Sequence, residues 1–285
     1  MHVFLTGASG YIGSAVLRSL LAHGHTVTAI VRSDQKAAAV RDAGGTAIVG
    51  DITDTDVVTR LAHECDAVVH TAATGDATSA TVDGDFVDTI LDALAGTPKR
   101  FVQTGGVWVF GNSTDISEHS PLDPPELTAW RIPIERAIRQ SDVHATVVAP
   151  GIVYGHGGGI PAMLSGDGTT DVRLIGDGSQ RWATVHVDDL AELYSLVLHH
   201  DRHDPIVIGA AGDNPTVREI GEAGARGRAV VRDSPNATRD RLGRPLADAL
   251  MMHQEAFGAH ARNEYGWQPA RPSLLDDTAS GSYAS

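Results

Sequence analysis

Over the first 150 residues of the chain, short apolar runs alternate with longer stretches in which apolar residues recur at helical spacing. The apolar runs predict strands at 2–6, 26–31, 46–49, 66–70, 100–104 and 144–149. The stretches between them predict helices near 11–23, 34–43, 54–63, 80–96 and 126–141. Strands that are apolar throughout and separated by helices are typical of a parallel sheet covered on both faces. The pattern therefore predicts an α/β fold with a doubly wound parallel sheet.

After Pro150 this alternation ends in a stretch that is rich in glycine. Beyond it we expect a pair of strands at 172–175 and 181–185, a helix over 187–200 and a strand at 205–208. Thr216 and Glu219 have the spacing of a capping box, which predicts that another helix begins there.

Composition excludes several classes of function. The 285 residues contain 36 acidic and 22 basic side chains, and a net charge of −14 repels nucleic acids and anionic membranes. The apolar runs are too short to cross a bilayer, the first strand leaves no room for a signal peptide, and the single Cys65 suits a reducing compartment. We therefore expect a cytoplasmic protein with no nucleic-acid or membrane partner. Its 14 histidines show no metal-binding spacing, so we expect no metal.

The most informative motif is the segment from Thr6 to Gly13, which reads TGASGYIG. It lies between a predicted strand and a predicted helix. A glycine-rich turn in that position binds a pyrophosphate through backbone N–H groups and the positive end of the helix. The glycines are spaced G-x-x-G-x-x-G. The motif predicts a dinucleotide cofactor.

The end of the second strand bears on which dinucleotide is bound. Arg32 and Ser33 stand where NAD-binding proteins carry an acidic residue, and an arginine accommodates the 2′-phosphate of NADP. We therefore expect NADP (NADPH) rather than NAD. Two alternatives stay open: Asp34 competes for this role, or Arg32 is a solvated loop charge.

The glycine spacing, with a threonine before it, resembles the short-chain dehydrogenase/reductase superfamily. Further segments resemble the extended, epimerase/dehydratase-like branch of that family, and they follow in the expected order up to about residue 276. These segments are Gly50-Asp51-Ile52, His70-Thr71-Ala72-Ala73, Ala149-Pro150-Gly151-Ile152-Val153-Tyr154-Gly155, His186-Val187-Asp188-Asp189-Leu190-Ala191 and Tyr265-Gly266-Trp267-Gln268-Pro269.

The resemblance implies a Rossmann-type domain and a smaller, discontinuous substrate-binding lobe. We expect the Rossmann domain at 1–150, with 176–210 returning to it, and the lobe at 151–175 and 211–285. A homodimer paired through the helices at 80–96 and 126–141 is implied as well. The motif and the resemblance together assign cofactor binding to Gly7, Ser9, Gly10, Tyr11, Ile12, Gly13, Arg32, Ser33, Asp51, Ile52, Thr71, Ala72, Ala73, Thr104 and Pro150.

The catalytic residues of the family are missing from this chain. Its serine position falls on Gly106, and its tyrosine and lysine fall on Trp130 and Ile134. The chain has no tyrosine between Tyr11 and Tyr154 and no lysine after Lys99, so no shift of register restores the pair.

The replacement candidates are Tyr154 and His156, in the glycine-rich segment that follows the sixth strand. The alternative for Tyr154 is that it is the structural tyrosine of the family's V-Y-G segment, which packs under the loop, and this alternative is favoured over the catalytic role. We expect a substrate pocket formed by Thr104, Gly106, Trp108 and Trp130. The two tryptophans fit an apolar wall of this pocket and a place in the hydrophobic core equally well.

These observations predict an NADP-dependent oxidoreductase that transfers hydride to a small apolar carbonyl, imine or conjugated substrate without the usual tyrosine–lysine pair. One alternative is a catalytically silent NADP-binding sensor. The other is an epimerase or lyase that retains the nucleotide.

Overall fold

The computed structural model describes residues 1–165 and 170–283. The chain forms two compact units. The first unit comprises Met1–Gly105, Trp130–Val148 and Ala191–Val207, and the second comprises Gly106–Ala129, Ala149–Leu190 and Ile208–Ser285. This division assigns 106–129 to the second unit, although the sequence prediction placed these residues in the Rossmann domain. A substrate-binding role for the second unit stays a prediction.

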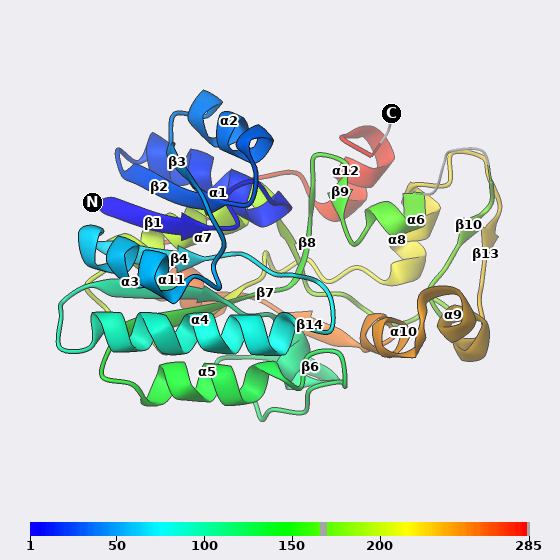
Figure 1. Ribbon diagram of the computed structural model, residues 1–285. Helices are drawn as coiled ribbons and strands as arrows, with labels where there is room; N and C mark the ends of the chain where they lie inside the picture. Colours follow the sequence, from blue (N-terminus) through cyan, green and yellow to red (C-terminus); the bar gives the residue numbers. More distant parts are fainter. Residues whose placement is uncertain (166–169, 284–285) are drawn as a thin grey trace. The chain divides into compact units, whose positions relative to one another are not determined.

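A seven-stranded sheet has the order β12-β7-β5-β4-β1-β2-β3 (Figure 1). Its strands are β1 (His2–Thr6), β2 (Thr26–Val31), β3 (Thr46–Val49), β4 (Ala67–His70), β5 (Arg100–Thr104), β7 (His144–Pro150) and β12 (Ile206–Gly209). The predicted parallel, doubly wound sheet is confirmed, because the pairings along this order from β3 to β7 are parallel. Strands β2 and β4 lie on opposite sides of β1, because the chain crosses from β3 at one edge of the sheet back to β4. The carboxyl ends of β1 and β4 therefore form the switch point at which such sheets bind ligands.

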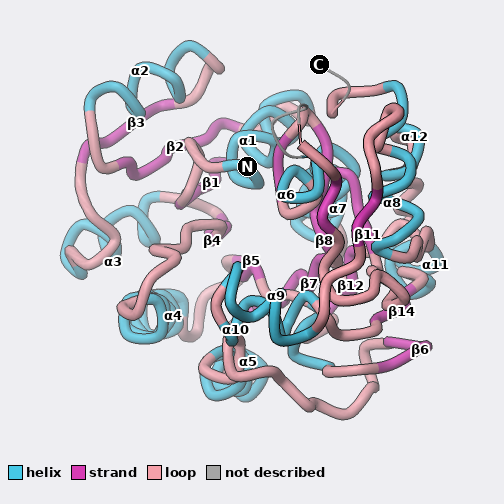
Figure 2. Tube along the Cα trace, turned by 90° about the vertical axis from the view of Figure 1, so that its right-hand side faces the viewer, coloured by secondary structure: helices cyan, strands magenta, loops and turns pink. Residues whose placement is uncertain are grey.

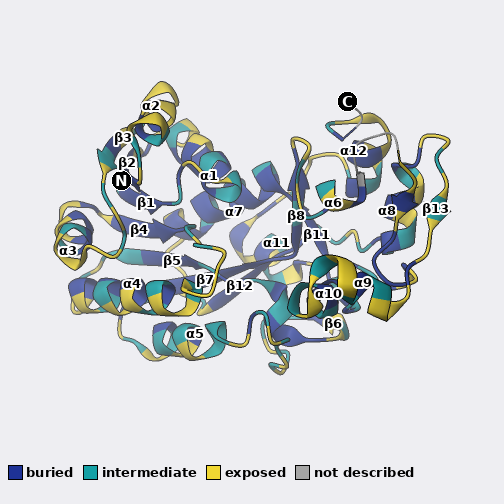
Figure 3. Cartoon of the chain, turned by 45° about the vertical axis from the view of Figure 1, so that its right-hand side comes forward, coloured by how far each residue is buried: buried dark blue, intermediate teal, exposed yellow. Residues whose placement is uncertain are grey.

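The apolar pattern also explains the core of the first unit. The central strands are largely buried (Figure 3). The side chains of Phe4, Leu5 and Val68 are fully inaccessible. Helices α1 (Tyr11–Ala22), α2 (Asp34–Asp42), α3 (Thr55–Glu64), α4 (Ser79–Leu94), α5 (Arg131–Gln140) and α7 (Val187–His199) follow the strands. Helices α4 and α5 lie side by side, as Figures 1 and 2 both show. Whether they pair with a second copy stays a prediction.

One boundary prediction in this region was wrong by five residues. Helix α5 begins at Arg131 and not at 126. The amides of Thr128 and Ala129 both donate to the carbonyl of Pro125, at 3.0 Å, in a turn that precedes the helix.

The second unit contains short elements. Its strands are β6 (Ser113–Ile116), β8 (Ile152–Gly155), β9 (Gly158–Gly159), β10 (Val172–Arg173), β11 (Thr184–His186), β13 (Val230–Val231) and β14 (Gln254–Ala256). Its helices are η1 (Val107–Phe110, a 3-10 turn), α6 (Ala162–Ser165), α8 (Val217–Ala223), α9 (Pro235–Leu242), α10 (Arg244–Leu250), α11 (Ala259–Tyr265) and α12 (Leu274–Ser280). The capping box at Thr216 is confirmed, since its side chain accepts from the Glu219 amide and the Glu219 carboxylate accepts from the Thr216 amide.

The predicted pairing of 172–175 with 181–185 was wrong. Strand β10 pairs with β13, and β11 pairs in parallel with β8. Both partners come from distant parts of the sequence, so a local hairpin pattern does not reveal them. Among the described residues, no helix has both the length and the hydropathy required to cross a membrane.

Candidate cofactor and active site

A pocket of about 540 Å³ opens at the switch point of the sheet. It is formed by the glycine-rich turn after β1 and by the residues that follow β2, β3 and β4. Its lining consists of Gly7, Ser9, Gly10, Tyr11, Ile12, Ile30, Val31, Arg32, Lys36, Gly50, Asp51, Ile52, Thr53, Thr71, Ala72, Ala73, Thr74 and Val82.

The glycine-rich turn is as tightly packed as a pyrophosphate site requires. A Cβ on Gly13 would lie 2.0 Å from the Gly7 carbonyl oxygen and 2.5 Å from Thr71 Oγ1, so α1 approaches the turn only with glycine here. Gly7 has φ +74°, and a Cβ there would lie 2.6 Å from the backbone of Thr71 and Ala72. Gly10 is the N-cap residue of α1 and supplies no side-chain cap to its first turn. These features fit the phosphates of a dinucleotide, which bind backbone N–H groups at a helix N-terminus.

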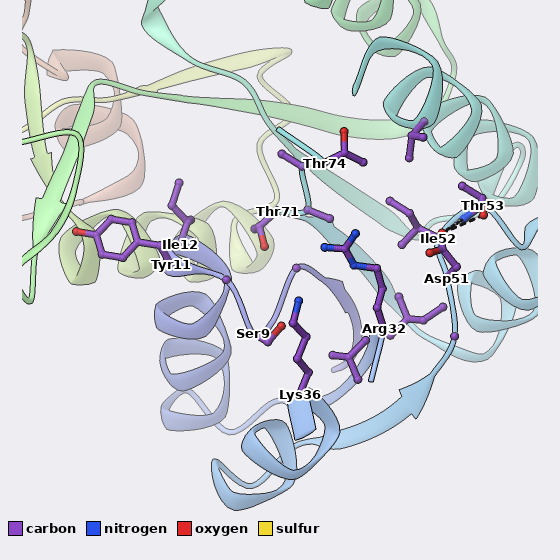
Figure 4. A pocket seen from close by; sticks show the side chains of 18 residues that line it. Ser9, Tyr11, Ile12, Arg32, Lys36, Asp51, Ile52, Thr53, Thr71 and Thr74 are labelled. Atoms are coloured by element: carbon purple, nitrogen blue, oxygen red, sulfur yellow. Dashed lines mark hydrogen bonds between the residues drawn. The ribbon is translucent and has the colours of Figure 1, made fainter. Parts of the chain in front are cut away.

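Two cations line the part of the pocket beyond β2. Arg32 follows the strand directly, and Lys36 comes from the first turn of α2. Figure 4 shows both side chains on the same side of the pocket as Ser9. Ser33 caps α2 by accepting from the Lys36 amide at 3.4 Å and does not line the pocket. Asp34, the possible competitor of Arg32, lies in the first turn of α2 and does not line the pocket either.

Asp51 provides the negative charge of the pocket at its far end from Tyr11 (Figure 4). Its Oδ1 accepts from the Thr53 amide at 3.0 Å and from Thr53 Oγ1 at 2.9 Å. The Thr53 amide contributes most to lowering the pKa of Asp51 below its ordinary value. The carboxylate is therefore ionised and held in place.

Eleven of the residues predicted to bind the cofactor line this pocket: Gly7, Ser9, Gly10, Tyr11, Ile12, Arg32, Asp51, Ile52, Thr71, Ala72 and Ala73. Gly13, Ser33, Thr104 and Pro150 do not line it. Their role in binding the cofactor, like that of the other eleven, stays a prediction. Lys36 also lines the pocket, and the sequence analysis missed it. Its position four residues after Arg32, in the first turn of the helix that follows β2, could have indicated that it faces the same pocket.

The carboxyl end of β5 holds a second polar group. Thr104 Oγ1 donates to the carbonyl of His70 at 2.7 Å and lies 2.6 Å from the phenol oxygen of Tyr194, which is fully buried. Because the threonine proton is used, the tyrosine is the donor in the second bond. Arg131 Nη1 donates to the Thr104 carbonyl at 3.0 Å, and its guanidinium lies 4.8 Å from the ring centroid of Trp130.

Glu135 is the unexpected residue in this region. Its side chain is on α5, one turn after Arg131. The residue is 3% exposed, and neither carboxylate oxygen has a hydrogen-bond partner among the described residues. Burial raises the pKa of Glu135 from 4.5 to about 7. A Cβ on Gly105 would lie 3.0 Å from Glu135 Oε1 and 2.7 Å from Val147 Cγ1, so glycine is required there.

The two catalytic candidates lie in the second unit and differ in exposure. Tyr154 is 1% exposed and its phenol donates to the Pro272 carbonyl at 2.8 Å. Burial raises the pKa of this phenol well above its ordinary value, so the geometry favours the packing interpretation of Tyr154. His156 is exposed, and its Nε2 donates to Asp188 Oδ2 at 3.0 Å.

The aromatic residues expected at the substrate pocket are placed in different units. Trp108 packs against the apolar core of the second unit, which includes Tyr154, Trp182 and Leu250. Trp130 belongs to the first unit, next to Arg131. Gly106 lies at the start of the 3-10 turn η1. Their contribution to a substrate pocket stays a prediction.

Comparison with known proteins establishes the family. Residues 3–209 match the NAD dependent epimerase/dehydratase family, to which the chain therefore belongs. An uncharacterised protein of Schizosaccharomyces pombe is 29% identical over 298 residues, which cover 99% of this chain and 100% of that protein. The 2′-dehydrokanamycin reductase of Streptomyces kanamyceticus is 28% identical over 232 residues, which cover 75% of this chain and 63% of the reductase.

Solved structures support the same fold. The dTDP-glucose 4,6-dehydratase of Bacillus anthracis, in complex with NAD, aligns with a TM-score of 0.81 at 16% identity, over 99% of this chain and 96% of that one. A human epimerase family protein with NADPH aligns with a TM-score of 0.77 at 24% identity, over 98% of this chain and 99% of that one.

Proposed function

We propose that the protein is an NADP(H)-dependent oxidoreductase that reduces a small apolar carbonyl, imine or conjugated substrate. The observation that carries the cofactor preference is the pair of cations, Arg32 and Lys36, in the pocket beside the glycine-rich turn. A guanidinium pairs with a phosphate through parallel N–H···O bonds, and an ammonium adds a point charge. When bound, the nicotinamide supplies the hydride. Relatives named as reductases, such as the kanamycin-pathway enzyme above, support the reaction class.

The cofactor preference is tested with Arg32→Ala and Lys36→Ala in titrations with NADPH and NADH. Loss of one charge-assisted contact, worth about 2 kcal/mol, weakens NADPH binding about thirty-fold. NADH lacks the 2′-phosphate, so its affinity stays nearly unchanged. Arg60→Ala is the matched control, because Arg60 is exposed on α3, does not line the pocket and pairs with Glu64. Equal weakening of both nucleotides by Arg32→Ala contradicts the preference.

For the chemical step we propose a role for Arg131. The family pattern expects a lysine on this helix, and the aligned residue is the apolar Ile134. In the structure, the cation at the carboxyl end of β5 is Arg131. A guanidinium remains protonated at all relevant pH values, so it stabilises developing negative charge but does not give up a proton. Water then supplies the proton to the enolate that hydride addition forms from a conjugated carbonyl substrate, whereas an iminium ion needs no proton.

The role of Arg131 is tested by replacing it with lysine and with glutamine. Arg131→Gln removes the charge and lowers kcat at least about a hundred-fold, in line with the loss of one oxyanion donor. Arg131→Lys retains part of the activity. The control is Arg136→Gln on the exposed face of the same helix. An unchanged kcat in Arg131→Gln, with NADPH affinity intact, contradicts the proposal.

A catalytically silent sensor is the second candidate function. It is favoured by the hydrogen bonding at Thr104, whose hydroxyl is held between His70 and Tyr194. Consumption of NADPH in the presence of any substrate excludes it.

A further inference from the structure

Three side chains of the second unit bring two imidazoles and a carboxylate together. They are His156 in the loop after β8, His186 at the end of β11 and Asp188 in the first turn of α7. Asp188 Oδ2 lies 3.0 Å from His156 Nε2 and 3.9 Å from His186 Nδ1. One donor atom from each residue can be chosen so that all three lie within 4.8 Å of one another. The sequence separates His156 from the other two by 30 residues or more, so spacing alone does not reveal the group.

The backbone at His156 is in a conformation that side chains rarely adopt. Its φ is +52°, and the glycines on both sides also have positive φ, +116° at Gly155 and +69° at Gly157. The left-handed conformation costs a non-glycine residue about 1–2 kcal/mol per residue. Contacts with the end of the chain hold this loop in place, because Gly155 N donates to the Tyr283 hydroxyl at 2.9 Å and Gly157 N donates to Ser282 Oγ at 2.8 Å. The loop is therefore fixed in a strained form that directs His156 toward Asp188.

The ring of His186 is fixed as well. It packs closely against Gly155, where a Cβ would lie 2.4 Å from Nε2 and 2.9 Å from Cε1. The Asp188 amide donates to His186 Nδ1 at 3.1 Å, so this nitrogen carries a lone pair and not a proton. The neighbouring Asp189 anchors the turn: its carbonyl accepts from Trp267 Nε1 at 2.7 Å, and its carboxylate accepts from two backbone amides at 3.1 Å.

We propose that His156, His186 and Asp188 bind a divalent first-row transition metal ion of the Zn²⁺ type, with water in the remaining positions. Two imidazoles and one carboxylate form a ligand set that Zn²⁺ accepts, and donors at its usual bond lengths of about 2.0–2.1 Å lie roughly 3.3 Å apart in a tetrahedral site. The His156–Asp188 pair is already near this spacing. His186 Nδ1 exchanges its hydrogen bond from the Asp188 amide for the metal, and the proton on His156 Nε2 moves to Nδ1, so that Nε2 offers its lone pair to the metal.

The proposal is tested on the full-length chain without an affinity tag, treated with a chelator and titrated with Zn²⁺ by calorimetry and with Co²⁺ by visible absorption. We expect one ion per chain. His156→Ala weakens the affinity at least ten-fold and abolishes the tetrahedral Co²⁺ bands. His119→Ala is the control, because it removes another exposed histidine of the same unit that is outside the group.

A second readout separates binding from damage to the fold. The midpoint of thermal unfolding of the wild type rises with Zn²⁺, whereas that of His156→Ala does not, although the two unfold alike without metal. Asp188→Asn tests the carboxylate in the same two assays. If the wild type binds Zn²⁺ no better than His156→Ala, the group is a hydrogen-bonded clamp of the loop and the proposal is wrong.

Discussion

Glu135 provides a quantitative test of the structure, because a buried carboxyl group without a partner makes stability depend on pH. Its pKa is raised from 4.5 to about 7 by burial and by Asp83, while Arg131 and Arg139 act in the opposite direction. Between these two values the unfolded chain has lost the proton and the folded chain still holds it. Folding stability therefore falls as pH rises from about 4.5 to 7, and the full loss persists above pH 7.

The magnitude follows from the size of the shift. At about 1.4 kcal/mol per pKa unit, the shift of Glu135 costs about 3 kcal/mol at alkaline pH. About 2–3 kcal/mol of this cost arises between pH 5 and pH 8, because part is already present at pH 5. Glu135→Gln keeps the shape of the side chain and removes the titration. We expect the stability of Glu135→Gln relative to wild type to increase by about 2–3 kcal/mol between pH 5 and pH 8.

The assay is urea unfolding of both proteins at the two pH values, followed by fluorescence and circular dichroism. Glu222→Gln, on the exposed surface of α8, is the control and shows no comparable change with pH. A difference between wild type and Glu135→Gln that is the same at pH 5 and pH 8 refutes the reasoning. It would mean that Glu135 is ionised in the folded protein, with contacts other than those described.

Two further predictions concern the first unit. Gly13→Ala places a Cβ 2.0 Å from the Gly7 carbonyl oxygen. We therefore expect its NADPH affinity, measured by titration, to fall at least ten-fold and its thermal stability to fall as well. The control Gly84→Ala leaves both intact, because the atom nearest to its Cβ is 3.8 Å away. Normal NADPH binding by Gly13→Ala would contradict the packing of the glycine-rich turn. Burial lowers the pKa of His25, which is 4% exposed, so stability falls as pH drops below about 6.5. His25→Phe loses less stability than the wild type in urea unfolding between pH 7 and pH 5. An identical loss in the two proteins would show that His25 does not titrate as described.

Much of the first unit was predictable, because parallel strands that are buried on both faces form nearly continuous apolar runs. The observed β2, β3 and β5 have the predicted bounds, and α2 begins at the predicted residue. Elements that depend on distant partners were not predictable in this way. Strand β10 is two residues long and pairs with β13, nearly 60 residues later, so its partner has no local signature.

The candidate site also combines features that a local sequence motif predicts with features that depend on distant parts of the chain. The glycine-rich turn is a local motif, and the structure places it at the pocket. Arg131 and Glu135 are side chains of one helix, and they became visible as candidates only when the structure placed them at the carboxyl end of β5. The predicted register instead aligned Trp130 and Ile134 with the family's catalytic tyrosine and lysine. Likewise, His156 was proposed as a catalytic candidate beside Tyr154, and its partners were missed. His186 ends β11, the strand parallel to β8, and Asp188 lies in the first turn of α7.

The measurement that tests the account most directly is the oxidation of NADPH by the purified protein with a panel of ketones, imines and enones, followed by absorbance of the reduced nicotinamide. The account predicts that at least one conjugated or imine substrate is reduced, that NADPH is used in preference to NADH, and that Arg131→Gln abolishes the reaction while it still binds NADPH. Tight binding of NADPH with no consumption across the whole panel would contradict it.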